Sequence, residues 1–300
     1  MKINRKIADK CPLCLQEKTP DFVGYRLNTK QGLFPGRNYS HSQKVVRCTR
    51  CKLIYNDPQV SPELDIFTED DSLMDVTHIS AEEIKATETY TDVLFFLKHT
   101  AKLLPGAKVL DVGSGIGRVV FVLKKTGYVV YSIEPKIELF DFAIKNNFTD
   151  AATAYNVTFE QAEFTKEGFD FIFLEPLNHF TDPHAAIQKG LGWLKPGGYL
   201  QLETVNSRWF YKRVLHLFYK LTFTKIVPYT SALRKPFHVC EYSAKTFQVY
   251  CHLNNLKLCN LNSYPCNTYI KIKWADKLMQ YLMRRFHSGA EVSVIIQKVI

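Results

Sequence analysis

The sequence predicts an α/β fold, in which a doubly wound, mostly parallel sheet follows a small N-terminal module held by a metal ion. Between residues 82 and 300, apolar runs with strand character alternate with segments of helical spacing, a pattern typical of parallel sheets with crossover helices. One of these runs, Val109 to Val112, leads directly into a glycine-rich turn and a helix. At the front of the chain, two C-x-x-C pairs supply four thiolates that can bind one metal ion.

Length and composition limit the function without choosing it. The 300 residues allow one large domain with a small module, and 46% hydrophobic residues suffice for a core. The net charge of +10 favours acidic partners such as nucleic acid, nucleotide-linked substrates or anionic lipid. The lysine-rich start has no apolar leader, and no apolar run reaches membrane-spanning length. We therefore expect a cytoplasmic protein, with peripheral contact to the inner face of a membrane and the oligomeric state both left open.

Residues 1–60 are expected to form a zinc ribbon. Two C-x-x-C hooks complete a four-sulfur structural site, and its ligands would be Cys11, Cys14, Cys48 and Cys51. Because we expect a reducing compartment, metal ligation is favoured over a disulfide pair, and a ribbon that has lost its metal is a further alternative. Leu15 and Lys52 follow the hooks where glycine is usual, which weakens the predicted knuckle geometry.

The end of the ribbon carries a resemblance. Cys51 to Pro58, C-K-L-I-Y-N-D-P, resembles the C-G-L-x-Y-x-x-P run that closes zinc ribbons in front of many bacterial methyltransferases. This resemblance implies a ribbon that supports the fold or shapes a substrate site. Basic residues around the hooks, with Tyr39 and Tyr55 as stacking groups, make an RNA-binding ribbon the alternative. These basic residues are Arg37, Lys44, Arg47, Arg50 and Lys52.

A connector is expected next. Prolines and the acidic run Glu69 to Asp71 interrupt any periodicity in residues 61–81. From Glu82 to Leu104, apolar residues recur at helical spacing. We expect this helix to open the larger domain, which would span residues 82–300.

The glycine turn is the centre of the larger domain. Its flanking residues predict a buried parallel strand before it and a helix after it, so that a ligand can approach backbone N–H groups at a helix N-terminus. The next strand, Tyr128 to Ile133, ends at Glu134, whose carboxylate could accept hydrogen bonds from a ribose diol. The spacing G-x-G-x-G differs from the dinucleotide fingerprint. Asp111, two residues before the first glycine, suits a positively charged ligand better than a pyrophosphate. A nicotinamide enzyme, or a turn without a ligand, remains an alternative.

Asp111 to Gly117, D-V-G-S-G-I-G, resembles motif I of the seven-stranded S-adenosylmethionine (SAM) methyltransferases. That resemblance implies a Rossmann-like sheet of seven strands, with SAM as the cofactor. It also implies that the turn holds the methionine end and that the acid after the second strand holds the ribose. The residues so implied are Asp111, Gly113, Ser114, Gly115, Gly117 and Glu134.

Later segments extend the resemblance to about residue 206. T-F-E-Q-A, at Thr158, resembles the family's T-L-E-E-A and implies that Thr158 and Phe159 frame the adenine edge. A strand that opens with F-D ends at Glu175, where ligands sit in open sheets. His179-Phe-Thr-Asp-Pro resembles E-H-x-x-D-P, but Asn178 replaces the family's glutamate. Any role that depends on the negative charge of that glutamate is therefore not expected here. L-K-P-G-G, at Leu194, is frequent before the fifth strand of this family.

Residues 207–235 and 271–288 are expected to form two helices that cover the substrate mouth. The first has a wide apolar arc and, opposite it, a basic stripe. The stripe is formed by Arg208, Lys212, His216 and Lys220. The second sets Trp274, Leu278 and Tyr281 against lysines and arginines. An interfacial helix pair on an anionic membrane is the second interpretation, and a partner or dimer contact is the third.

The candidate catalytic residues are His238 and Tyr242, which follow the first cover helix, and His179, which lies after the strand that opens with F-D. Pro236 to Phe247 resembles the family's H-x-x-x-[FY]-S-x-x-T-L, which crosses the active-site mouth in relatives. This implies that His238 and Tyr242 contact the substrate. His238 could serve as a general base because imidazole titrates near physiological pH. For both His238 and His179, bracing the loop is the alternative role.

Together these features predict a SAM-dependent methyltransferase that acts on a small or medium substrate, by resemblance a sugar, a polysaccharide precursor or a metabolite. O-methylation is favoured, because sugar C-methyltransferases with this ribbon carry a further C-terminal domain. The alternatives are a zinc-ribbon RNA methyltransferase and a non-catalytic module that binds SAM or a membrane.

Overall fold

A computed structural model describes residues 3–6, 9–17, 20–27, 42–62, 91–231, 238–265 and 271–299. Arg37, Tyr39, most of the predicted connector and the first part of the helix predicted from Glu82 lie outside these residues. The chain divides into two compact units. The first comprises Met1–Glu63, Pro176–Ala186 and Leu202–Ile296, and the second comprises Leu64–Glu175, Ile187–Gln201 and Gln297–Ile300.

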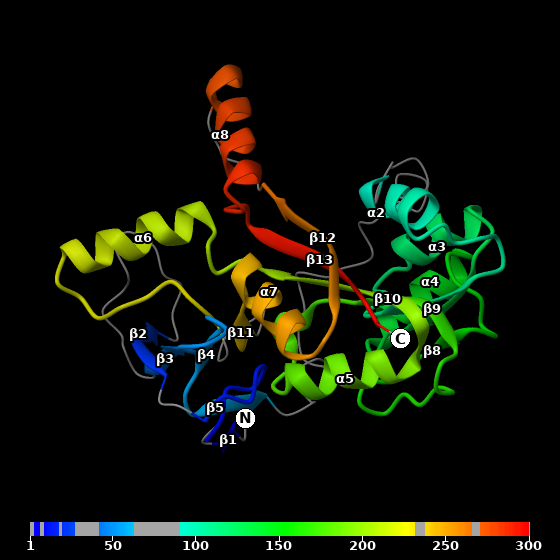
Figure 1. The fold of residues 1–300 in the computed structure, drawn as a ribbon, viewed down its shortest axis with the longest axis horizontal. Helices are drawn as coiled ribbons and strands as arrows, with labels where there is room; N and C mark the ends of the chain where they lie inside the picture. The colour runs from blue at the N-terminus through cyan, green and yellow to red at the C-terminus, as the bar shows by residue number, and fades with distance from the viewer. Residues whose placement is uncertain are drawn as a thin grey trace. The chain divides into compact units, whose positions relative to one another are not determined.

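A seven-stranded sheet is the main element of the fold, and it confirms the predicted fold class (Figure 1). Its strand order is β12-β13-β10-β9-β6-β7-β8. The strands are β6 (Lys108–Val112), β7 (Val129–Ile133), β8 (Ala154–Tyr155), β9 (Phe169–Leu174), β10 (Leu194–Val205), β12 (Lys257–Tyr264) and β13 (Glu291–Gln297). The pairs β6–β7, β6–β9 and β7–β8 are parallel.

The direction in which the sheet grows reverses at β6. The chain passes from β6 to β7 and β8 on one side, and then returns to β9 on the other side of β6. Val109 and Leu110 are fully buried there, as expected for a parallel strand with neighbours on both sides. In open α/β sheets, such a reversal leaves a crevice at the carboxyl ends of the strands. The glycine turn begins at that end of β6.

Helices alternate with these strands. They are α2 (Thr91–Phe95), α3 (Arg118–Lys125), α4 (Ile137–Lys145) and α5 (Pro183–Trp193), and α2 continues into the π-helical turn η4 (Phe96–Thr100). Asp182 accepts a hydrogen bond on Oδ1 from the N–H of Ala185 (2.9 Å), which caps the start of α5 as the Asp-Pro pair predicts. The L-K-P-G-G segment differs from its prediction, because β10 already includes it from Leu194 onward.

The cysteine-bearing segments form a second sheet, with the order β11-β4-β3-β2. Its strands are β2 (Asp21–Leu27), β3 (Ser42–Arg47), β4 (Ile54–Asn56) and β11 (Cys240–Glu241), and β1 (Ile3–Lys6) pairs separately with β5 (Gln59–Pro62). β2 and β3 lie between the two cysteine hooks in the sequence. The fourth strand, β11, comes from the segment that carries His238, and Cys240 pairs with Tyr55 in antiparallel register.

The remaining elements of the first unit are η5 (Leu177–His179), α6 (Phe210–Leu221), α7 (Ala244–Leu253) and α8 (Lys273–Arg285). Ser243 and Thr246 form a reciprocal capping box at the start of α7. Among the described residues, no helix combines the length and the apolar character needed to cross a bilayer.

Candidate functional site

The glycine turn after β6 has the backbone that its sequence predicts. Gly113, Gly115 and Gly117 all have positive φ angles, of 79°, 54° and 81°. The N–H groups of Gly113 and Ser114 donate to the carbonyl oxygen of Ile133 at 2.9 and 3.1 Å, which ties the turn to the end of β7. The turn then enters α3 with Gly117 as its N-cap.

Two of these glycines serve different purposes. A Cβ atom added to Gly115 would meet no atom within 4 Å, so its backbone borders open space. At Gly117 the same atom would lie 3.0 Å from Cβ of Phe148 and 3.2 Å from Cβ of Ala143. Gly117 therefore permits close packing against α4, whereas Gly115 leaves room beside the turn for a ligand.

Glu134 lies directly after β7 and faces the turn. Its Oε2 accepts from the N–H of Gly115 at 2.7 Å, and its Oε1 accepts from the N–H of Lys136 at 2.8 Å. Burial raises the pKa of Glu134, and the two backbone hydrogen bonds oppose that shift. A carboxylate has about four lone-pair sites, so each oxygen retains capacity for a ligand hydroxyl.

Asp111, in β6, is a buried carboxyl with an orphaned oxygen. The residue is 3% exposed, and its Oδ2 has no hydrogen-bond partner among the described residues. Burial, and secondarily the charge of Glu134, raises the pKa of Asp111 to about 7. A buried acceptor of this kind is costly unless a donor or a cation satisfies it.

The other predicted cofactor residues lie in the same unit. Glu175, after β9, accepts on Oε1 from Nε2 of Gln201 at 2.9 Å. The N–H of Thr158 donates to Oε1 of Gln161, and Oγ1 of Thr158 accepts from the N–H of Gln161. The ring of Phe159 is buried, 5.2 Å from the ring of Trp193. Phe159 therefore belongs to the core, with only its edge and backbone left for any adenine contact.

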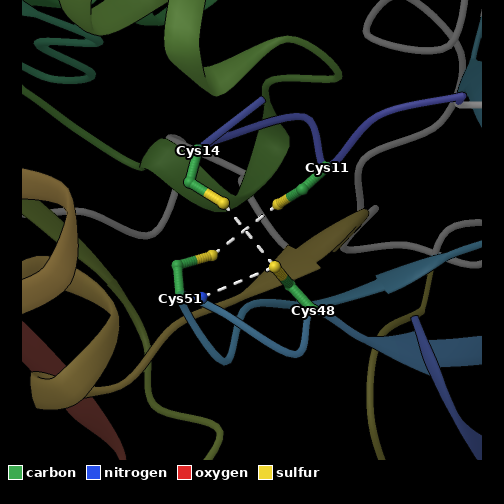
Figure 2. Close-up of side chains that lie close together, drawn as sticks. All are labelled: Cys11, Cys14, Cys48 and Cys51. Atoms are coloured by element: carbon green, nitrogen blue, oxygen red, sulfur yellow. Dashed lines mark hydrogen bonds between the residues drawn. The ribbon is translucent and has the colours of Figure 1, made fainter. Parts of the chain in front are cut away.

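The four hook cysteines converge on one point (Figure 2). The Sγ atoms of Cys11 and Cys51 lie 3.6 Å apart, as do those of Cys14 and Cys48. All four sulfur atoms lie within 4.8 Å of one another. Sulfurs bound tetrahedrally to zinc at about 2.3 Å stand about 3.8 Å apart. The donor set and its spacing therefore fit a structural four-thiolate zinc site.

The knuckles keep their usual backbone although glycine is missing from them. Leu15 and Lys52 have φ angles of 56° and 65°, in the left-handed region that glycine normally occupies. The N–H of Leu15 donates to the carbonyl of Cys11 at 3.0 Å, and that of Lys52 donates to the carbonyl of Cys48 at 3.1 Å. The geometry that the sequence called into doubt is therefore retained, at the cost of local strain.

One expectation about the ribbon surface, a stacking role for Tyr55, is wrong, whereas its predicted basic character is reduced. Tyr55, considered as a stacking group, is 3% exposed because β4 lies between β3 and β11. Lys44 pairs with Asp57 (3.4 Å), and Arg47 pairs with Asp21 (3.2 Å). The charge of this surface is thus partly neutralised by its own carboxylates.

A cavity of about 300 Å³ lies within the first unit, at the lower end of the range for small-molecule sites. Its polar lining residues include Arg26 from β2, Trp209 and Lys212 at the start of α6, and His238 and Glu241 at β11. The indole N–H of Trp209 and Oε2 of Glu241 have no hydrogen-bond partner among the described residues. Two residues that line the cavity therefore carry an unpaired polar atom, one a donor and one an acceptor.

Lys212 and Glu241 form a buried ion pair beside this cavity. Nζ of Lys212 lies 2.6 Å from Oε1 of Glu241, and the side chains are 12% and 1% exposed. The same oxygen accepts from the N–H of Thr230 at 2.6 Å. The predicted basic stripe on α6 is therefore wrong in part, because Lys212 faces inward to meet an acid that helical spacing alone does not reveal.

The two histidines lie together, with ring centroids 5.5 Å apart. Burial lowers the pKa of His179 to about 4. Burial, then the proximity of His179 and of Lys212, lowers the pKa of His238 to about 3. Both imidazoles are therefore neutral at physiological pH, and His238 lines the cavity.

Tyr242 is fully buried and does not line the cavity. Its hydroxyl donates to the carbonyl of Leu177 at 3.4 Å, and its ring stacks on Phe247. Asn178 joins the same region, because its carbonyl accepts from the N–H of Val239 and its Oδ1 accepts from Oγ1 of Thr204. Tyr242 and Asn178 therefore fix the backbone that carries the two histidines.

Sequence reasoning missed an acidic pair next to the cavity. Burial, with the charge of Glu291, raises the pKa of Glu203 to about 7. Glu291 lines the cavity, and burial raises its pKa as well. Glu203 lies in β10 and Glu291 in β13, so only the strand order brings the two together.

Comparison with known proteins gives a family match over much of the chain. The family described as "Methyltransferase domain" matches residues 85–261. Phosphoethanolamine N-methyltransferase 3 of Arabidopsis thaliana is 32% identical over 127 residues, which cover 40% of this chain and 24% of that protein. Ubiquinone biosynthesis O-methyltransferase of Haemophilus ducreyi is 32% identical over 119 residues, which cover 37% of this chain and 50% of that protein.

The chain thus spans a quarter to a half of the length of these two relatives. Among solved structures, an S-adenosylmethionine-dependent methyltransferase from Mesorhizobium loti is similar with a TM-score of 0.48 and 15% identity. That similarity covers 68% of this chain and 97% of the other.

Proposed function

The chain belongs to the methyltransferase-domain family, whose match covers more than half of its length, and we propose that it transfers a methyl group from SAM to a small-molecule acceptor. The proposal rests on the arrangement of residues at the end of β6. There an open glycine turn, a buried carboxyl with an orphaned oxygen and an acid fixed by two backbone N–H groups come from adjacent parallel strands.

These residues fit SAM in shape and charge. SAM, when bound, supplies a methyl group on a positively charged sulfur. Gly115 lets the ligand approach the backbone of the turn, and Glu134 accepts the ribose hydroxyls on the lone pairs left by its two backbone donors. Asp111 meets the positive charge of the methionine part. A cation there favours the ionised carboxylate and lowers the raised pKa of Asp111.

We propose that the cavity beside α6 and β11, within the first unit, binds a small ligand. Trp209 and Glu241 offer it one donor and one acceptor, and the neutral imidazole of His238 can accept a hydrogen bond from a hydroxyl group. With a pKa of about 3, His238 is a weak base, so its main task is to orient the hydroxyl rather than to hold its proton. Tyr242, Asn178 and His179 act as positioning residues for this segment.

We infer that the cysteine cluster binds zinc and that the ion has a structural task. Four thiolates leave no open coordination position for chemistry. The cluster instead holds the ends of strands that border the cavity, since β2 supplies Arg26 and β4 pairs with β11. This agrees with a ribbon that shapes the substrate site, and O-methylation of a sugar, polysaccharide precursor or metabolite remains the favoured reaction.

Two measurements test the proposal. The first is SAM binding by calorimetry to the wild-type protein and to Asp111→Ala, with the exposed Glu138→Ala as the control. We expect Asp111→Ala to weaken binding by about tenfold or more and Glu138→Ala to leave it unchanged. Absence of SAM binding by the wild type would overturn the proposal and favour the non-catalytic alternative.

The second measurement identifies the acceptor. Protein is incubated with isotopically labelled SAM and with separate fractions of metabolites, glycans and RNA, and the products are analysed by mass spectrometry. We expect label in the small-molecule or glycan fraction. Label in RNA, with binding that weakens steeply as salt rises, would establish the RNA methyltransferase alternative instead.

A further inference from the structure

The outward faces of α6 and α8 carry rows of exposed apolar side chains. On α8, Trp274, Leu278 and Tyr281 are 71%, 49% and 62% exposed and lie at the i, i+4, i+7 spacing of one helix face. On α6, the corresponding row is Val214, Leu217 and Leu221. Single exposed apolar residues are ordinary, but such rows mark an interaction surface.

The opposite faces of both helices are already packed. On α6, Tyr219 is 2% exposed, and Lys212 points inward to Glu241. On α8, Met283 is 1% exposed. The outward rows are therefore additional to the faces that hold these helices in the unit, and they do not belong to the core.

Cations flank both rows. The exposed basic residues are Lys273, Lys277, Arg284 and Arg285 on α8 and Arg213 and Lys220 on α6. α6 contains no acidic residue, and the acid of α8, Asp276, accepts a hydrogen bond from Nε2 of Gln280. Each row thus combines apolar and aromatic side chains with positive charge.

The two helices meet at a common corner of the first unit. The N–H of Phe210, the first residue of α6, donates to the carbonyl of Ser288 at 3.0 Å, just after α8. Nδ2 of Asn206 donates to the carbonyls of His287 and Gly289, each at 2.9 Å. In Figure 1, α6 and α8 run outward from this corner. The two helices are therefore joined through one hydrogen-bonded junction.

We propose that α6 and α8 form a docking surface for an anionic lipid bilayer. Trp274 and Tyr281 have the amphipathic rings that favour the boundary between headgroups and acyl chains. The flanking lysines and arginines can extend their charged ends to lipid phosphates while their stems stay in the apolar layer. A second copy of the chain fits less well, because the same face on two copies would bring cations against cations.

This surface is separate from methyl transfer, so the two proposals fail independently. The test measures sedimentation of the full chain with vesicles of phosphatidylcholine alone and of phosphatidylcholine mixed with phosphatidylglycerol. One variant, Trp274→Ser/Leu278→Ser, removes the apolar row of α8. A second, Lys277→Glu/Arg284→Glu/Arg285→Glu, reverses the flanking charge. Leu104→Ser is the matched control, because Leu104 is 75% exposed but lies in the other unit.

We expect the wild type to bind the anionic vesicles and to release them as salt rises above about 0.15 M. Each α8 variant should lose about tenfold or more in vesicle affinity at unchanged melting temperature, whereas Leu104→Ser should keep it. Wild-type binding that is absent, or equal on neutral and anionic vesicles, would overturn the proposal. The proposal would also be overturned if the wild type does not bind vesicles and instead forms a dimer that the Trp274→Ser/Leu278→Ser variant dissociates.

Discussion

The carboxyl group of Asp111 couples the ligand site to the stability of the protein. The pKa of Asp111 is about 7 in the folded chain and about 3.9 in an unfolded chain. Between these two pH values, the carboxyl is mostly protonated in the folded state and mostly ionised in the unfolded state. The folded state then binds more protons than the unfolded state, so the free energy of unfolding falls as pH rises from about 4 to about 7. Below that window, the group adds no pH dependence.

We predict that Asp111→Asn removes this part of the pH dependence in the ligand-free protein. The wild type should lose up to about 1.4 kcal/mol per pH unit more than the variant within the window. Urea unfolding at a series of pH values measures the difference. Glu203 contributes with the same sign in both proteins and cancels. The exposed Asp141→Asn is the control, and an equal slope in all three proteins would contradict the assignment.

The ion pair of Lys212 and Glu241 gives a second prediction at this scale. Lys212→Met leaves the carboxylate of Glu241 buried without its cation and should cost about 3–5 kcal/mol of unfolding free energy. Adding Glu241→Gln removes the charge, retains an acceptor for the N–H of Thr230, and should recover most of the loss. Chemical denaturation of the two single variants and the double variant gives the coupling energy.

An exposed pair provides the contrast. Nζ of Lys124 and Oδ1 of Asp150 lie at a similar distance, 2.7 Å, but their side chains are 27% and 60% exposed. Lys124→Met should therefore change stability by less than about 1 kcal/mol. If Lys212→Met lowered the free energy of unfolding by no more than Lys124→Met does, the pair of Lys212 and Glu241 would be solvated.

Among the elements, the ribbon was predicted best and the cover helices least well. The four cysteines, by their spacing alone, indicated one site, and their sulfur atoms do converge. The apolar arc of α6 was expected to face inward, yet Val214, Leu217 and Leu221 face out. On the inward face of the helix, Lys212 instead pairs with Glu241, which is remote in sequence. Periodicity gives the two faces of a helix but not which of them is buried.

The cysteine cluster predicts an effect of zinc on a strand, β11, that supplies none of its ligands. We expect about one zinc per chain in the purified protein by elemental analysis, and Cys48→Ser should bind less zinc and melt at a lower temperature. Because β4 pairs with β11, loss of the ion should also loosen the Cys240–Glu241 segment, seen as faster amide exchange there.

Cys259→Ser is the matched control for that experiment. Cys259 lies in β12, outside the cluster. The zinc content of Cys259→Ser, and the amide exchange of its Cys240–Glu241 segment, should therefore equal those of the wild type. Equal zinc content in Cys48→Ser and the wild type would contradict the four-thiolate site.

At the scale of the whole molecule, the sequence predicted the α/β class and the seven strands, and it proposed a ligand site at the carboxyl ends of the strands. Those features depend on local patterns: apolar runs, the glycine turn and an acid after the next strand. The cavity was not predicted, because Arg26, Trp209, Glu241 and Glu291 come from four separate segments. Only the pairing of β4 with β11 and the strand order bring such residues into one place.

That pairing of β4 with β11 also has a consequence for biosynthesis. β4 leaves the ribosome long before β11 and can pair with β3 on one side, but its other edge has no partner until Cys240 and Glu241 have been made. During that interval, β4 presents an unpaired edge with the sequence Ile-Tyr-Asn, which other chains can join. The nascent protein is thus exposed to misassembly until β11 emerges, and early metal capture by the hooks would limit the conformations open to it.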